Sequence, residues 1–246
     1  MDEREFHDRL ADISTHWTLL EKAHGESPDA AQAAWQELTR RYLGAVYRYL
    51  LAAVRDVDAA QELAQEFAVR FISGRFRAAT PDRGRFRSYL KTCLFHLVDD
   101  FQLRRGRDPV RQAADADDVE PAAASEDRDR CFLESWRSEL LARCWRRLEE
   151  EQAVSGQPYF TVMRLRVDHP EAKSAALAEL LAARLGRPVT AAAARQSLHR
   201  ARQRFAELLY DETSTSLGTA LRDEIEEELA ELELLKYCKP IFEHPP

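Results

Sequence analysis

Apolar residues recur at steps of three and four along most of the chain, and this spacing limits the possible folds more than any other feature. It places apolar side chains on one face of a helix, where they can pack against other helices. No segment alternates apolar and polar residues with the β-branched enrichment of a strand. We therefore expect an all-α protein. The predicted helices cover about residues 29–51, 56–72, 86–105, 132–154, 159–167, 174–185, 190–210 and 219–235.

An acidic segment, residues 108–129, interrupts this pattern. It holds eight acidic and two basic residues and almost no large apolar side chain, so it cannot bury a core of its own. We expect it to be a flexible linker between two small helical domains. The predicted organisation is an N-terminal extension at 1–28, a first domain at 29–107, the acidic linker at 108–130, a second domain at 131–211 and an acidic helical extension at 212–246.

Charge is divided among blocks, which is more informative than the net charge of −7. Residues 70–107 carry ten basic and three acidic residues, a local balance of +7. Residues 211–246 carry ten acidic and three basic residues, a local balance of −7. A basic block can contact phosphate groups while acidic blocks keep the free protein off nucleic acid.

Several classes of protein are disfavoured. The N-terminus has no secretory signal and no segment is apolar enough to span a membrane, so we expect a cytoplasmic protein without a membrane partner. The four cysteines are far apart and form no C-x-x-C pair, so we expect reduced thiols, no metal site and no cofactor. The histidines do not pair with glutamates at metal-binding spacing. We do not expect an enzyme, although a helical-bundle metalloenzyme or hydrolase remains the alternative from another class.

The clearest local motif is a pair of predicted helices around Gly186. The first carries Leu177, Leu180 and Leu181, and the second follows a short connection and a Thr190 cap. A short helix, a tight turn and a second helix with a basic outer face are typical of a helix-turn-helix that reads the DNA major groove. An ordinary helical hairpin with a solvated basic face gives the same pattern. The candidate DNA-binding residues are Arg195, Gln196, His199, Arg200 and Arg202.

A second motif interleaves basic and aromatic residues between residues 73 and 107. Basic groups can follow a nucleic-acid backbone while rings hold an unpaired base. The other interpretation places the rings in the core and the arginines in solvent, and for Phe86 and Tyr89 it is the expected one. The candidate residues are Arg75, Arg83, Arg85, Arg87, Lys91, Phe95, His96, Arg104 and Arg105. A third feature is a polar ridge, Glu62, Gln65 and Glu66, on an otherwise apolar helix.

Three segments together resemble one protein family, the extracytoplasmic-function type of bacterial sigma factor. The segment DVDAAQELAQEFAVRFI is similar to the family's signature helix. The segment PDRGRFRSYLKTCLFHLVDDFQLRRGR resembles its promoter-melting helix. The segment LAELLAARLGRPVTAAAARQSLHRARQRFAELL resembles its C-terminal DNA reader. The three segments stand in the family's order on both sides of a linker.

The resemblance implies two partners, core RNA polymerase and promoter DNA. It implies that the Glu62, Gln65 and Glu66 ridge faces the polymerase clamp. The loop from Arg75 to Arg85 would capture a flipped base of the minus-ten element, with Lys91, Phe95 and His96 along the same wall. The helix-turn-helix would meet the minus-thirty-five element. His96 replaces a commonly seen Asn, and Ser197 stands where many relatives carry Arg, so the bases read stay open.

Two related interpretations remain beside this one. A stand-alone helix-turn-helix regulator would use the second domain but leaves the polar ridge without a purpose. A sigma-like adaptor that does not depend on promoter melting would keep polymerase binding. The sequence does not choose among an anti-sigma factor, a regulatory kinase and the acidic C-terminal helix as the regulator.

Overall fold

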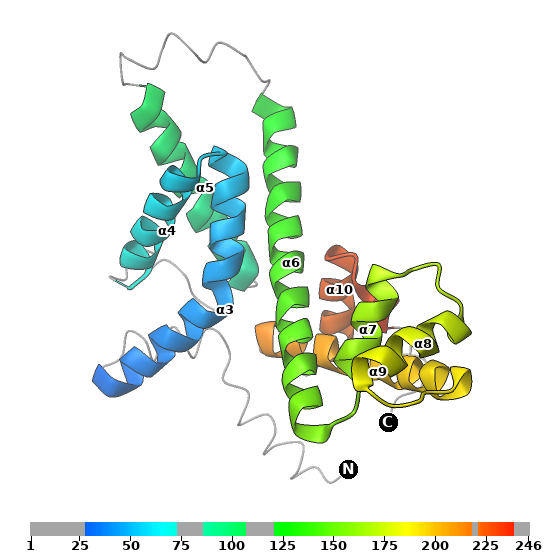
Figure 1. The fold of residues 1–246 in the computed structure, drawn as a ribbon. Helices are drawn as coiled ribbons and strands as arrows, with labels where there is room; N and C mark the ends of the chain where they lie inside the picture. The colour runs from blue at the N-terminus through cyan, green and yellow to red at the C-terminus, as the bar shows by residue number, and fades with distance from the viewer. Residues whose placement is uncertain (1–27, 73–85, 107–120, 218–220, 239–246) are drawn as a thin grey trace. The chain divides into compact units, whose positions relative to one another are not determined.

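The three- and four-residue apolar spacing is realised as helices throughout the computed structural model, which describes residues 28–72, 86–106, 121–217 and 221–238 (Figure 1). All regular elements in these ranges are α-helices, as predicted for the fold class. No helix within them is long and apolar enough to cross a lipid bilayer. The helices are α3 (Pro28–Val54), α4 (Val57–Ile72), α5 (Phe86–Gly106), α6 (Pro121–Ser155), α7 (Tyr159–Asp168), α8 (Ser174–Leu185), α9 (Ala191–Leu217) and α10 (Arg222–Glu231).

The chain forms two compact units. The first contains α3, α4, α5, α6 as far as Glu139 and the last residues of α9, from Thr215. The second contains α6 from Leu140, α7, α8, the rest of α9, and α10. The predicted N-terminal extension lies outside the described residues except for Pro28, and so do linker residues 108–120.

The core of the first unit comes from the apolar faces of α3, α4 and α5. Tyr49 and Leu50 of α3, Leu63 of α4, and Leu90 and Leu97 of α5 are among its fully enclosed side chains. Burying a side chain of this size stabilises a fold by about 1.5–3 kcal/mol. Asp56 caps α4, because its Oδ1 accepts a hydrogen bond from the backbone N–H of Ala59 at 3.1 Å.

The core of the second unit brings α7, α8 and α9 together. Val162 and Leu165 of α7 pack with Leu177 and Leu181 of α8 and with Leu198 of α9. Further along α9, Phe205, Leu208 and Leu209 are also buried. From α10, Ile225 and Leu229 are buried as the apolar stripe of the predicted acidic helix indicates.

The start of α6 corrects one boundary. Residues 121–130, predicted as part of the flexible linker, are helical, and α6 begins at Pro121 and not near Phe132. Proline suits the first position of a helix, and the alanines after it favour helix. The helix is also held by ion pairs to α5, from Arg128 to Asp99 at 2.9 Å and from Asp129 to Lys91 at 3.2 Å. Residues 131–139 belong to the first compact unit and not to the second.

Candidate functional site

The turn between α8 and α9 is built by two residues singled out in the sequence. Gly186 follows α8 with φ 64°, a left-handed conformation that glycine adopts without strain. The hydroxyl of Thr190 then accepts a hydrogen bond from the backbone N–H of Ala193 at 3.1 Å and caps α9. These two features end one helix and start the next within five residues, as the helix-turn-helix interpretation requires.

The two faces of α9 separate as predicted. Ala194, Leu198 and Ala201 are buried against α7 and α8. The opposite face is exposed, and it carries all five candidate DNA-binding residues, Arg195, Gln196, His199, Arg200 and Arg202. Arginine can bond guanine edges bidentately and glutamine can do so with adenine edges, so this face has the chemistry of a major-groove reader.

Two further arginines near this face were not singled out from the sequence. Arg184 lies in the last turn of α8 and Arg187 in the connection to α9, and both are exposed. The sequence could have identified both arginines by their position beside the start of the candidate reading helix, where side chains commonly contact phosphate groups.

The polar ridge on α4 divides into exposed and engaged residues. Glu62 and Gln65 are exposed, whereas Glu66 is half-buried. Glu66 accepts hydrogen bonds from Arg70 at 2.5 Å and from Arg104 of α5 at 3.0 Å. Arg70 also contacts Asp100 of α5 at 3.1 Å. Burial alone would raise the pKa of the Glu66 carboxyl, but the bonds from Arg104 and Arg70 outweigh it and lower the pKa.

The basic and aromatic candidates of α5 differ in accessibility. His96 and Arg104 are exposed, and Arg105 is half-buried with its guanidinium 5.6 Å from the centre of the Phe101 ring. Arg87, expected to face DNA, is only 9% exposed. Arg87 follows the buried Phe86 in the first turn of α5. Arg75, Arg83 and Arg85 lie outside the described residues.

Lys91 and Phe95 of α5 contact residues of α6. Lys91 pairs with Asp129, and its Nζ lies 5.7 Å from the centre of the Phe95 ring. The guanidinium of Arg128 lies 4.6 Å from the same ring centre. Phe95 also stacks on Tyr49 of α3, with ring centres 5.7 Å apart. Composition alone placed Arg128 and Asp129 in the linker, and the sequence carried no signal for these contacts.

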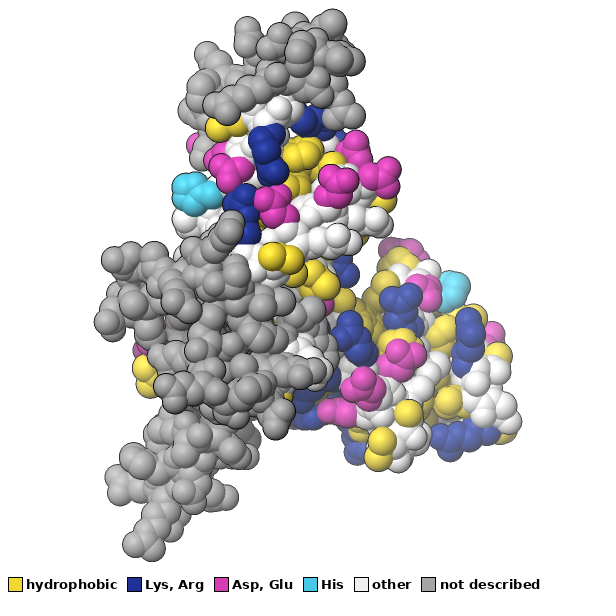
Figure 2. Space-filling view, turned by 90° about the vertical axis from the view of Figure 1, so that its left-hand side faces the viewer, with side chains coloured by type: hydrophobic (Ala, Val, Ile, Leu, Met, Phe, Trp, Pro, Cys, Tyr) yellow, Lys and Arg dark blue, Asp and Glu magenta, His cyan; other side chains and the backbone are white. Residues whose placement is uncertain are grey.

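The surface presents both signs of charge. Figure 2 shows Lys and Arg side chains interspersed with Asp and Glu side chains over the described part of this side. On the described part of this face, therefore, no large region of a single sign would by itself attract nucleic acid.

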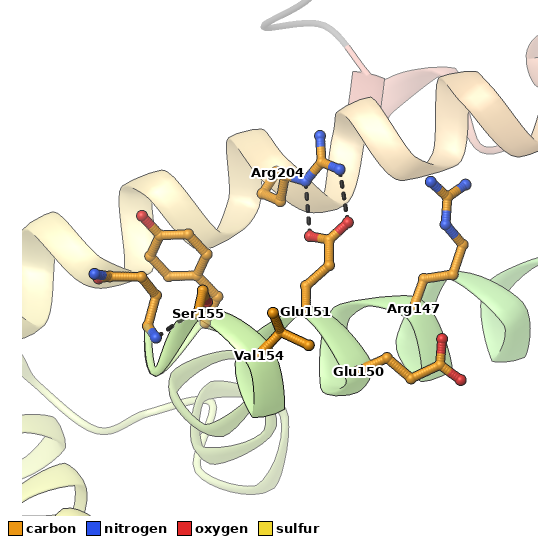
Figure 3. A pocket seen from close by; sticks show the side chains of 8 residues that line it. Arg147, Glu150, Glu151, Val154, Ser155 and Arg204 are labelled. Atoms are coloured by element: carbon orange, nitrogen blue, oxygen red, sulfur yellow. Dashed lines mark hydrogen bonds and ion pairs between the residues drawn. The ribbon is translucent and has the colours of Figure 1, made fainter.

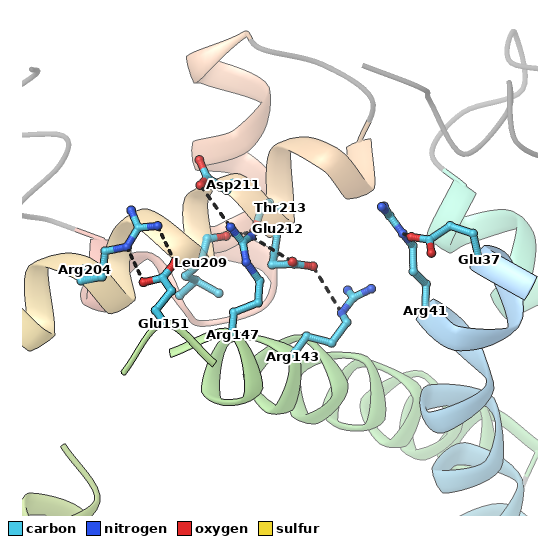
Figure 4. Close-up of polar contacts among 10 residues, drawn as sticks. All are labelled: Glu37, Arg41, Arg143, Arg147, Glu151, Arg204, Leu209, Asp211, Glu212 and Thr213. Carbon is cyan, nitrogen blue, oxygen red and sulfur yellow. Dashed lines mark hydrogen bonds and ion pairs between the residues drawn. The ribbon is translucent and has the colours of Figure 1, made fainter. Parts of the chain in front are cut away.

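Ion pairs join α6 to α9 inside the second unit (Figure 4). Arg143 and Arg147 both contact Glu212, at 3.5 Å and 3.1 Å. Arg204 binds the Glu151 carboxylate through two nitrogens, at 2.6 Å and 2.8 Å. The bonds from Arg204 lower the pKa of Glu151 despite partial burial. These pairs position the helix that carries the candidate reading face.

An open pocket of about 530 Å³ lies beside this network (Figure 3). Its lining comes from the end of α6, the start of α7 and Arg204 of α9. The Arg204 and Glu151 charges balance each other within it. Arg147 and Glu150 also line the pocket, so its lining holds two positive and two negative side chains.

Metal and thiol chemistry have little support in the described residues. Within them, no group of three or more His, Cys, Asp and Glu side chains is arranged to hold a metal ion. The four cysteines are free. Burial raises the pKa of Cys93 to about 11 and that of Cys144 and Cys238 to about 12, so these thiols stay protonated and unreactive near neutral pH.

Comparison of the chain with protein-family models, with curated proteins and with solved structures gave no match. The resemblance to sigma factors therefore rests on the three quoted segments.

Proposed function

We propose that this protein is a sigma factor of the extracytoplasmic-function type, which binds core RNA polymerase and directs promoter recognition, melting and transcription initiation. The observation that carries the proposal is the pairing of two exposed surfaces in one chain. One is the α9 face, where all five predicted DNA-binding residues are exposed. The other is the α4 surface with Glu62 and Gln65, which a DNA reader alone would not need.

Each unit has a role in this proposal. The first unit binds the polymerase clamp through Glu62 and Gln65 and engages the minus-ten element through α5 and residues 75–85. The second unit binds the minus-thirty-five element through α9. Glu66 contributes mainly by holding α4 against α5, because its carboxylate is already paired with Arg70 and Arg104.

Polymerase would supply what the free chain lacks. Two readers joined by a tether have a low effective concentration for two sites at a fixed distance, and docking on a larger enzyme removes that cost. The net charge of −7 also opposes binding of the free chain to DNA. We therefore expect weak binding to promoter duplex without polymerase, and steep salt dependence in the assembled complex.

Reconstitution with core polymerase tests the proposal. The purified chain should associate with the core enzyme in a pull-down and support run-off transcription on genomic fragments. Glu62→Lys should abolish association by reversing an exposed charge on α4. Glu149→Lys is the matched control, because Glu149 is an exposed glutamate of α6 in the second unit. If the wild-type chain does not associate with polymerase, the proposal is wrong.

A stand-alone helix-turn-helix regulator is the second candidate, favoured by the geometry of α8 and α9. It predicts tight, sequence-specific binding to duplex DNA by the chain alone at physiological salt. A mobility-shift assay without polymerase therefore separates the two functions.

A further inference from the structure

Residues 128–132 of α6 lie on the part of α5 that the proposed function assigns to the minus-ten element. Arg128 donates a hydrogen bond to the backbone carbonyl of Phe95 at 3.2 Å and pairs with Asp99 at 2.9 Å. Its guanidinium also sits over the Phe95 ring. One residue later, Asp129 neutralises Lys91. Two of the candidate DNA-contacting side chains, Lys91 and Phe95, are therefore in contact with the chain's own helix.

An aromatic stripe on α6 extends this contact along α3. Phe132 lies edge-on to Phe95, with ring centres 6.5 Å apart, and to Tyr49, at 5.8 Å. Trp136 stacks on Tyr42 with ring centres 5.2 Å apart. Both α6 side chains are buried. Steps of four residues separate Arg128, Phe132 and Trp136, so one face of the helix makes all these contacts.

The far end of this face fits a glycine on α3. A Cβ atom at Gly44 would overlap the carboxylate of Glu139. Glu139 is 7% exposed, and its carboxylate accepts a hydrogen bond from Arg48 at 2.5 Å. A buried carboxylate is costly unless it is paired, so the glycine and the arginine together accommodate it. The packing of α6 on the first unit is thus supported independently at both ends.

We propose that residues 128–139 of α6 form an internal cover that competes with single-stranded DNA for Lys91 and Phe95. Asp129 takes the place of a phosphate on Lys91, and Arg128 and Phe132 take the place of a base on Phe95. The inference rests on the proposed function, because that function assigns Lys91 and Phe95 to DNA. The contacts described for the cover are with α3 and α5, so the Glu62 and Gln65 surface of α4 is a different face.

The cover reduces the apparent DNA affinity to the intrinsic affinity multiplied by the fraction of molecules in which the cover is open. An apparent dissociation constant equals the intrinsic one divided by the competent fraction, so weakening the cover tenfold tightens binding by up to about tenfold. Arg128 contributes a cation–π contact, an ion pair and a backbone hydrogen bond. Losing them should weaken the cover by about tenfold.

Arg128→Ala in the full chain provides the test, with binding to a short, labelled single-stranded DNA of mixed sequence measured by fluorescence anisotropy. The variant removes a positive charge, which by charge alone would weaken binding. We expect tighter binding instead, by about tenfold. Arg130→Ala is the matched control, because Arg130 is exposed and pairs with Asp127 of its own helix at 2.7 Å. This control should bind no more tightly than the wild type.

A second variant tests the cover at its other end. Gly44→Ala should also tighten DNA binding, because the buried Glu139 carboxylate would have to leave its bond with Arg48 to make room. Glu139→Ala added to it should reverse the gain by removing the overlap. Hydrogen exchange over residues 128–139 should be faster in Arg128→Ala and Gly44→Ala than in the wild type. Unchanged or weaker DNA binding by both variants, with faster exchange, would overturn the inference, as would unchanged exchange.

A polymerase pull-down on the same proteins separates the two proposals. If wild type and Arg128→Ala both associate with polymerase but bind single-stranded DNA equally, the cover is wrong and the proposed function stands. If neither associates with polymerase, the proposed function fails, and the cover fails with it as a promoter device.

Discussion

Replacement of Gly186 by alanine isolates the energetic cost of the turn between α8 and α9. Gly186 has φ 64°, and a Cβ atom built on it meets no atom within 4 Å. Loss of stability therefore comes from backbone strain and not from a clash. An L-residue in the left-handed region costs about 1–2 kcal/mol. The lower entropy of the unfolded alanine chain returns about 0.4–1 kcal/mol of this. We expect a net loss of about 1 kcal/mol.

Gly156 supplies a matched control in the same unit. It has φ 70°, and a Cβ there also meets nothing within 4 Å. Gly156→Ala should therefore destabilise the second unit by the same amount, while leaving the α8–α9 turn intact. Gly186→Asn should recover most of the loss, because asparagine tolerates this conformation better than alanine.

Urea unfolding followed by circular dichroism measures all three variants. The midpoints for Gly186→Ala and Gly156→Ala should fall together, and only the former should weaken use of the minus-thirty-five element in run-off transcription. An unchanged midpoint for Gly186→Ala, or no recovery in Gly186→Asn, would refute the reasoning from backbone strain.

Three further predictions concern the second unit. Because the folded pKa of Glu151 is lowered from its ordinary 4.5, its pair with Arg204 adds stability above that pH, and this stability is lost as the pH falls through the folded pKa. Glu151→Gln should therefore flatten the acid side of a profile of melting temperature against pH. An identical profile in the variant and the wild type would contradict this. Leu181→Ala should cost about 2–5 kcal/mol in urea unfolding, because this buried side chain packs in the α7–α8–α9 core, and a loss below that range would show that the core relaxes around the cavity. Replacing Arg195 and Arg200 with alanine should weaken use of the upstream element in run-off transcription while polymerase association in a pull-down stays intact, and loss of association would assign α9 a different role.

Local sequence chemistry predicted the helices and the α8–α9 turn. Apolar spacing identified α5, α7 and α8 with bounds within a residue or so, and Thr190 caps the helix that it was expected to cap. These features depend on residues close together in the chain, which a sequence displays directly.

Features that depend on distant partners could not be predicted. Residues 121–130 of α6 have a linker-like composition, and the ion pairs of Arg128 and Asp129 involve residues 29 and 38 positions earlier, Asp99 and Lys91. Likewise, the sequence does not reveal that Glu66 pairs with Arg104 or that Arg87 is buried. Composition shows which side chains a segment can bury by itself, whereas contacts with distant residues determine which of its side chains become paired or buried in the folded protein.

Because Glu66 is paired with both Arg70 and Arg104, it adds little net negative charge to the surface that α4 presents to a partner. Its carboxylate is already matched by two guanidinium groups, whereas Glu62 is open to solvent. Asp58, four residues before Glu62 on α4, is also exposed, so a cationic docking site would be attracted mainly by these two carboxylates. Added salt screens exposed charges over about 10 Å at 0.1 M, so it weakens both kinds of contact. Because few charges are involved here, the loss of association should be far smaller than for contacts with a phosphate backbone, where each neutralised phosphate releases counterions.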